Sequence, residues 1–252
     1  MKYKIINNNK KRNLLILHCI CGNTNIFKEQ FPILSKKYNF ILLDLPAHGE
    51  SLDYTDNFNF EIIANNILHI LQSNNLKNID ILSISMGAMI TEILIKKSPK
   101  NLINKVVFTS TIIGFPIRIM DYMFHFFVKL FDIFPRFLCM HFITHTMLPF
   151  KFNKSQRNKL YKYSLIMNKK ALKKYLKQMS NFIINHKDFS STSLKNYCND
   201  YIYINGELDR LFLPKLRKHI DTKHLITIKG ASHLCNIDKS TEFNNILCRF
   251  LI

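Results

Sequence analysis

Tryptophan is absent from this chain, and acidic residues are scarce. The sequence of 252 residues has 17 acidic and 36 basic residues, with 6 glycines and 7 prolines. No stretch reaches the ~18 consecutive apolar residues that a membrane-spanning helix needs. The basic N-terminus and the short apolar run at residues 14–20 make a poor signal peptide. We therefore expect a cytoplasmic protein, and we find neither an internal repeat nor a low-complexity linker.

The formal net charge of +19 has two explanations. One is an acidic partner, such as nucleic acid, an anionic membrane or an acidic carrier protein. The other is coding bias, because lysine, asparagine and isoleucine are abundant while glycine is scarce. The lysines are dispersed and no nucleic-acid-binding motif is present, so we predict no nucleic-acid partner.

Cysteine spacing gives no sign of a metal site. The six cysteines include one C-x-C pair, Cys19 and Cys21, and no second pair that would complete a zinc site. Scattered, unpaired cysteines are typical of a reducing compartment. We predict no metal and no cofactor.

The residues that indicate chemistry begin with Ser83-Ile84-Ser85-Met86-Gly87. An apolar run precedes this segment and another follows it, which predicts a strand, a sharp turn and a helix with Ser85 at the apex. Small residues are required two positions on either side, and Ser83 and Gly87 are small. Such a nucleophile elbow points to acyl-transfer chemistry, although Ser85 taken alone could be an ordinary N-cap.

An activated serine needs a base, and the base needs an acid that orients it. Asp209 follows the predicted strand 201–204, and His233 follows the predicted strand 225–228. Parallel sheets carry working residues at the carboxyl ends of their strands, so the three side chains are expected at one edge. Glu207 competes with Asp209 for the role of the acid. Met86, the residue after the nucleophile, is the expected first oxyanion donor.

Four segments together resemble the α/β-hydrolase superfamily. Residues 17–22 resemble its L-H-G-x-x-G loop, residues 43–51 resemble D-L-P-G-H-G-x-S, and the elbow and the Asp209 and His233 loops complete the set. The resemblance assigns the second oxyanion donor to Ile20, with Cys19 as the alternative. It assigns His18, His48 and Asp44 mainly to loop structure, while Ser51 and Ser110 are expected to be caps or turn residues.

The resemblance implies an α/β fold: a mostly parallel central sheet flanked by helices, with a helical cap inserted after the sixth strand, residues 105–110. The core domain is expected at residues 1–112 and 198–252, and the cap or lid at 113–197. A single edge strand is expected at residues 3–6, where the family usually has two. Further predicted elements are a strand at 40–43 and helices at about 26–37, 61–74 and 237–251.

The predicted cap has an aromatic half and a basic half. Phe124, Phe127, Phe131 and Phe134 recur at helical spacing, and Pro116, Pro135 and Pro149 are expected to separate helices. Residues 151–179 carry ten basic residues and no acidic one. The aromatic stripe either packs on the core or lines an acyl pocket, and the basic half suits an acidic acyl carrier protein or an anionic lipid surface.

These features predict a serine hydrolase that cleaves a carboxylic ester or thioester through an acyl-serine intermediate, with Ser85, His233 and Asp209 as the catalytic residues. The chain is similar to carboxylesterases that cleave pimeloyl methyl esters. The related lyases carry an arginine where this chain has Met89, which counts against that subgroup. The alternatives are a lysophospholipase or monoglyceride lipase at a membrane surface, and a non-catalytic binding protein on a hydrolase scaffold.

Overall fold

The computed structural model describes the whole chain except residues 56, 114–116, 148–153, 186–193, 195 and 211. Its centre is a 7-stranded sheet with the order β1-β3-β2-β4-β5-β6-β7. β1 pairs antiparallel with β3, and every other pair is parallel. The strands are β1 (Tyr3–Ile6), β2 (Arg12–Leu17), β3 (Tyr38–Leu43), β4 (Ile79–Ile84), β5 (Ile103–Thr109), β6 (Asp200–Gly206) and β7 (Leu225–Ile228).

Alternating side chains divide the core between the two faces of the sheet. On β2, Leu15 and Leu17 join one hydrophobic cluster, while Leu14 and Ile16 join the other. Helices α2 (Phe60–Ser73) and α3 (Met86–Lys97) cover the first face, and α1 (Phe31–Leu34) and α11 (Ser240–Leu251) cover the second. Full burial of both faces explains why the central strands are continuous apolar runs.

The predicted fold class is confirmed, and the single N-terminal edge strand is present. The strand before the cap, predicted as the sixth, is the fifth along this chain because one strand precedes β2 where the family usually has two.

Two predicted helices differ from the structure. The helix expected at about 26–37 is a 3₁₀ turn, η1 (Thr24–Phe27), followed by the one-turn helix α1. Asn23 caps η1 through its side chain, and Pro32 stands in the first turn of α1, where it cannot continue an earlier helix. The helix expected at 237–251 is divided into α10 (Cys235–Asp238) and α11 at Lys239, whose backbone is not helical.

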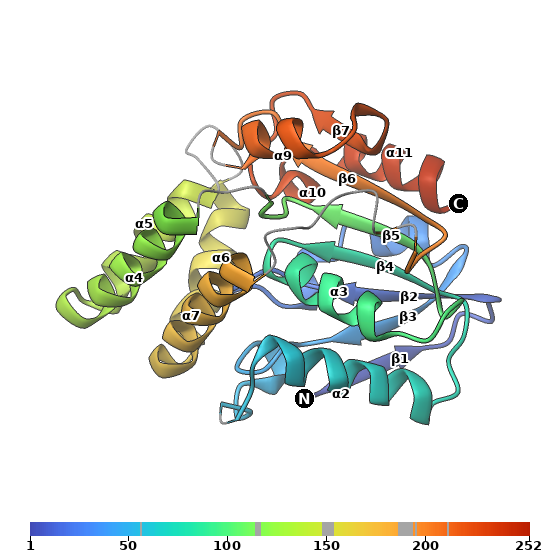
Figure 1. Cartoon of the computed structure of the whole chain (residues 1–252), viewed down its shortest axis with the longest axis horizontal. Helices are drawn as coiled ribbons and strands as arrows, with labels where there is room; N and C mark the ends of the chain where they lie inside the picture. The colour runs from blue at the N-terminus through green and yellow to red at the C-terminus, as the bar shows by residue number, and fades with distance from the viewer. Residues whose placement is uncertain (56, 114–116, 148–153, 186–193, 195, 211) are drawn as a thin grey trace.

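Among the described residues after β5, four long helices lie in the segment predicted to form the cap. They are α4 (Ile117–Ile133), α5 (Arg136–Met147), α6 (Lys154–Ile166) and α7 (Lys169–Asn185). The arrowheads of the parallel strands point toward these helices, and α4 and α5 lie farthest from the sheet (Figure 1). Helix α7 contacts both α4 and α3, so it joins the outer helices to the core.

One of the three prolines predicted to separate helices lies among the described residues. Pro135 separates α4 from α5, whereas Pro116 and Pro149 lie outside the described residues. Phe124 and Phe131 of the aromatic stripe are buried, Phe127 is half-buried, and Phe134 at the end of the stripe is exposed. Across the described ranges, we find no helix that combines the length and the apolar character needed to cross a membrane.

Candidate active site

Ser85 stands on a sharp turn between β4 and α3. Its backbone has φ +53° and ψ −113°, a region that residues with a side chain rarely adopt. The Ser85 N–H donates to the Thr109 carbonyl at 2.8 Å, which ties the turn to the end of β5. The strained turn and the short strand-to-helix connection are those of a nucleophile elbow.

The small residues on either side of Ser85 have separate structural reasons. A Cβ at Gly87 would lie 2.5 Å from the Leu17 carbonyl oxygen, so any side chain there would push α3 away from the end of β2. Ser83 is fully buried, and its hydroxyl donates to the Val107 carbonyl at 3.1 Å. The hydroxyl of Ser83 is therefore accommodated by a hydrogen bond inside the sheet.

The structure brings Ser85, His233 and Asp209 together. Nε2 of His233 lies 3.1 Å from Oγ of Ser85, and Nδ1 of His233 lies 2.8 Å from Oδ2 of Asp209. All three residues are buried. Because the carboxylate only accepts, Nδ1 carries the ring proton and Nε2 is left to accept from the Ser85 hydroxyl. The arrangement can remove a proton from Ser85.

Glu207, the competing acid, faces elsewhere. Its side chain is exposed, and Oε2 accepts from the Gly230 N–H at 2.9 Å. Asp209 is instead oriented by two further donors, the Phe212 N–H at 3.3 Å and the Asn205 side-chain amide at 3.4 Å. The geometry thus selects Asp209 as the neighbour of His233.

Ser110, which the sequence predicted to be a cap or turn residue, helps to hold the histidine loop, together with residues for which no sequence pattern predicts a role. The Ser110 hydroxyl donates to the carbonyl of His233 itself. Asp238 accepts from the Ser232 N–H at 2.8 Å, and the Phe212 ring lies 5.2 Å from the His233 ring. Ser110 has φ +50° at the end of β5, but no sequence pattern shows that its hydroxyl reaches a loop 123 residues further along the chain.

The two predicted oxyanion donors lie on adjacent segments. Met86 is the first residue of α3, where backbone N–H groups have no partner within the helix. In the turn after β2, the Gly22 N–H bonds to the Cys19 carbonyl and the Cys21 N–H bonds to Nε2 of His48. The N–H groups of Cys21 and Gly22 are therefore already hydrogen-bonded, which leaves those of Ile20 and Cys19 as the candidates for the second oxyanion donor.

His18 and His48 connect the two loops around this turn. Nε2 of His18 accepts from the Leu45 N–H, and Nε2 of His48 accepts from the Cys21 N–H, both at 3.0 Å. Burial lowers the pKa of His18, and burial together with the neighbouring His18 lowers the pKa of His48 to about 3. Both rings are consequently neutral acceptors at physiological pH, and their role is structural.

One residue of the segment predicted to form the cap is anchored to the same region. Tyr175 of α7 is fully buried, and its hydroxyl donates to the Pro46 carbonyl at 2.9 Å. Its ring lies 5.1 Å from His48 and 4.6 Å from Phe58. Helix α7 is thus fixed to the loop that supports the Cys19–Gly22 turn.

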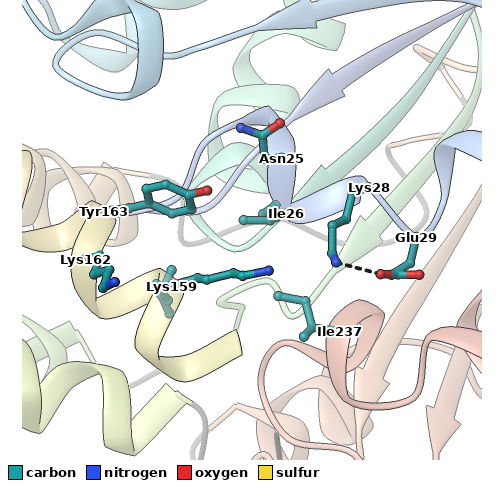
Figure 2. A pocket seen from close by; sticks show the side chains of 9 residues that line it. Asn25, Ile26, Lys28, Glu29, Lys159, Lys162, Tyr163 and Ile237 are labelled. Atoms are coloured by element: carbon teal, nitrogen blue, oxygen red, sulfur yellow. Dashed lines mark ion pairs between the residues drawn. The ribbon is translucent and has the colours of Figure 1, made fainter. Parts of the chain in front are cut away.

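A cavity of about 330 Å³ lies where α6 meets the core. Its floor is apolar, from Ile26, Leu160 and Ile237, and lysine side chains stand around it (Figure 2). Lys28 pairs with Glu29, and Lys159 reaches across the opening in Figure 2. Ile26 lies four residues after the Cys19–Gly22 turn and Ile237 lies four residues after His233, but Ser85, Asp209 and His233 do not themselves line this cavity. Such a volume is at the lower end of the ~300–1,000 Å³ typical of small-molecule sites.

Metal ligation has no candidate in the part of the chain that the structure describes, because no three His, Cys, Asp or Glu side chains gather there. Cys19 and Cys21 are buried free thiols, and burial raises the pKa of each to about 12. Both cysteines are accordingly neutral turn residues.

Comparisons with known proteins agree with this architecture. The family model of the alpha/beta hydrolase fold matches residues 12–240, so the chain belongs to this family. The chain is similar in structure to MenH from S. aureus (19% identity, TM-score 0.78), with 99% of this chain and 97% of that one covered. It is also similar to a bromoperoxidase from Bacillus anthracis (18% identity, TM-score 0.80) and an esterase from Exiguobacterium antarcticum (14%, 0.77), each over 99% of this chain and 94% of the other. No curated protein matches it by sequence.

Proposed function

We propose that this protein is a serine hydrolase that cleaves a carboxylic ester or thioester through an acyl-serine intermediate. The observation that carries the proposal is the hydrogen-bonded series from Ser85 through His233 to Asp209, with separations of 3.1 and 2.8 Å. Family membership and the strained turn at Ser85 support the same chemistry.

In the proposed reaction, His233 takes the proton of Ser85 as its oxygen attacks the substrate carbonyl. Asp209 holds the ring in the required tautomer and stabilises the imidazolium that forms. His233 then gives the proton to the leaving alcohol or thiol, which leaves the acyl group on Ser85. A water molecule, activated by the same ring, releases the carboxylic acid and restores the serine.

The tetrahedral oxyanion requires preorganised donors. We assign this role to the backbone N–H groups of Met86 and Ile20. Removing one such donor typically costs about 10²- to 10³-fold in kcat. The brace formed by His18 and His48 acts through the turn that carries Ile20, so these residues are positioning residues in the proposal.

The proposed substrate has an apolar acyl chain and an anionic group. The cavity beside α6 supports this assignment as a separate subsite, because lysines surround its apolar lining while Ser85, Asp209 and His233 do not line it. An acidic acyl carrier protein or a lipid would present such chemistry in the cytoplasm. Met89, buried in α3, offers no charge to a substrate, which favours an ester hydrolase over the lyases.

The test is hydrolysis of p-nitrophenyl esters of increasing chain length. Ser85→Ala is expected to lower kcat/KM by about 10⁴- to 10⁶-fold, with residual activity from the oxyanion donors. Ser98→Ala is the matched control, because Ser98 caps the other end of the same helix and its hydroxyl donates to the Leu94 carbonyl at 2.8 Å. Unchanged turnover in Ser85→Ala would reject the proposal, and an inactive wild type would favour the non-catalytic scaffold.

A further inference from the structure

The outer helices of the cap expose an unusual amount of apolar surface. We call the exposed large apolar side chains of α4, α5 and the short connection between them the hairpin patch, and their exposed fractions run from 47% to 74%. They are Tyr122, Phe126, Ile133, Phe134, Phe137, Leu138 and Phe142. The other exposed large apolar residues in the described ranges are divided among the N-terminal strand, α6, Tyr197 and the C-terminal residue. Contiguous apolar patches on soluble domains mark interaction sites.

The hairpin patch contains a continuous aromatic strip. The ring centroids of Tyr122 and Phe126 lie 6.5 Å apart, and those of Phe126 and Phe127 lie 6.2 Å apart. Phe127 of α4 then lies 6.2 Å from Phe142 of α5. The rings therefore run from one helix to the other rather than standing as isolated surface residues.

Core packing does not account for this strip. On the inner side of α4, Phe124, Val128 and Phe131 are already buried. Helix α4 is thus apolar on two sides, a pattern expected of a helix that is covered all round. The exposed side chains of the hairpin patch are left uncovered by the rest of the described chain. Helices α4 and α5 themselves lie at the end of the molecule farthest from the sheet (Figure 1).

Lysine side chains lie near the C-terminal end of α4, where Asp132 pairs with Lys173 of α7. Lys129 of α4 is exposed. Lys173 of α7 bonds to Asp132, and with Lys169 and Lys177 it lowers the pKa of that carboxyl. Helices α6 and α7 contain no acidic residue, so Asp132 is outnumbered by the lysines beside it.

We propose that the α4–α5 hairpin docks on the surface of an anionic lipid bilayer. The hairpin patch enters the boundary between headgroups and acyl chains, while the lysines of α4 and α7 contact lipid phosphates. A second copy of this chain would bring two strongly positive caps together, which opposes a dimer through this face. An acidic carrier protein would match the charge but would leave the aromatic strip without an apolar partner.

Docking itself is independent of the chemistry at Ser85. Its consequence rests on the proposed function: the cap, anchored through Tyr175 beside the candidate site, would lie at the interface where esters with apolar acyl chains gather. Activity on such esters is then expected to rise in the presence of anionic vesicles.

Co-sedimentation with vesicles tests the inference directly, with phosphatidylcholine alone or mixed with phosphatidylglycerol. Wild type and Ser85→Ala are expected to bind the mixed vesicles equally, and more weakly in high salt. Phe126→Ser with Phe142→Ser is expected to lower the partition coefficient by at least about tenfold. Ile5→Ser with Ile252→Ser is the matched control, because it removes exposed apolar groups far from the cap and should leave binding unchanged.

Circular dichroism melting serves as the folding control, and both double variants are expected to remain folded because the substituted positions are exposed. The inference is overturned if wild type shows no preference for anionic vesicles, or if the control pair loses binding as much as the cap pair. A dimer that the Phe126→Ser/Phe142→Ser variant dissociates would also overturn it, as would binding to an acidic acyl carrier protein without binding to vesicles.

Discussion

Glu207 and Asp209 lie two residues apart in one loop, yet only Asp209 contacts His233. The carboxylate of Asp209 accepts from Nδ1 at 2.8 Å, whereas that of Glu207 accepts from the Gly230 N–H. The turn after β6 therefore separates an acid that can orient the histidine from one that braces the neighbouring loop.

This separation predicts different effects for two isosteric substitutions. Asp209→Asn is expected to lower kcat by about 10⁴-fold, because the amide favours the wrong tautomer of His233. Glu207→Gln keeps an acceptor for Gly230 and should leave kcat nearly unchanged. Steady-state kinetics with a p-nitrophenyl ester measures both, and a larger loss in Glu207→Gln than in Asp209→Asn would reverse the assignment.

The buried imidazole of His48 predicts a loss of stability in acid. Its pKa in the folded protein is about 3, lowered mainly by burial, against 6.5 for the free side chain. The neutral form is thus favoured by folding, so the stabilisation is complete above pH 6.5 and is lost as pH falls toward about 3. His48→Gln should flatten this part of the pH profile.

Urea unfolding at several pH values measures the His48 effect. His69→Gln is the control, since His69 is exposed on α2 and should leave the profile unchanged. An identical acid slope in His48→Gln and wild type would contradict the neutral, buried assignment.

Glu92 predicts the opposite dependence on pH. Burial raises its pKa from 4.5 to about 7, although the ion pair with Lys96 at 3.0 Å acts against the shift. The protonated form is favoured by folding, so this stabilisation is present below pH 4.5 and is lost as pH rises through about 7. Glu92→Gln should therefore gain stability relative to wild type between about pH 5 and about pH 8.

The measurement for Glu92 is the difference in unfolding free energy between these two pH values. Glu61→Gln, which alters an exposed carboxylate on the neighbouring helix α2, serves as the control. If Glu92→Gln and wild type keep the same difference, the buried carboxylate does not titrate as described.

Lysines beside the cavity predict a preference for anionic esters. Lys159→Gln with Lys162→Gln is expected to lower kcat/KM for a carboxylate-bearing ester by about tenfold relative to a neutral ester of the same length. Lys77→Gln with Lys100→Gln removes the same charge from exposed positions elsewhere and should leave the ratio unchanged. Equal losses in the two double variants would assign the effect to net charge alone.

Much of the site follows from local sequence patterns. Tight turns need small residues at fixed offsets, so Ser85 could be placed at the apex of its turn without coordinates. Asp209 and His233 each follow a short apolar strand, and parallel strands bring such positions to one edge. The apolar run of β2 and the single strand before it were equally readable.

The remaining features depend on contacts between distant parts of the chain. The bond from Ser110 to the His233 carbonyl and that from Tyr175 to Pro46 leave no periodic signal. The helix predicted around Pro32 shortened because capping at Asn23 stabilised a separate turn. The aromatic stripe of α4 was visible in the sequence, but which side the core covers is decided only by packing on α7.

Covalent labelling with a fluorophosphonate, followed by mass spectrometry of the peptides, tests the central claim most directly. The account predicts stoichiometric phosphonylation of Ser85, none in Ser85→Ala, and much slower labelling in His233→Ala, because the ring must remove the serine proton. Labelling of wild type at another residue, or a rate at Ser85 that does not depend on His233, would contradict it.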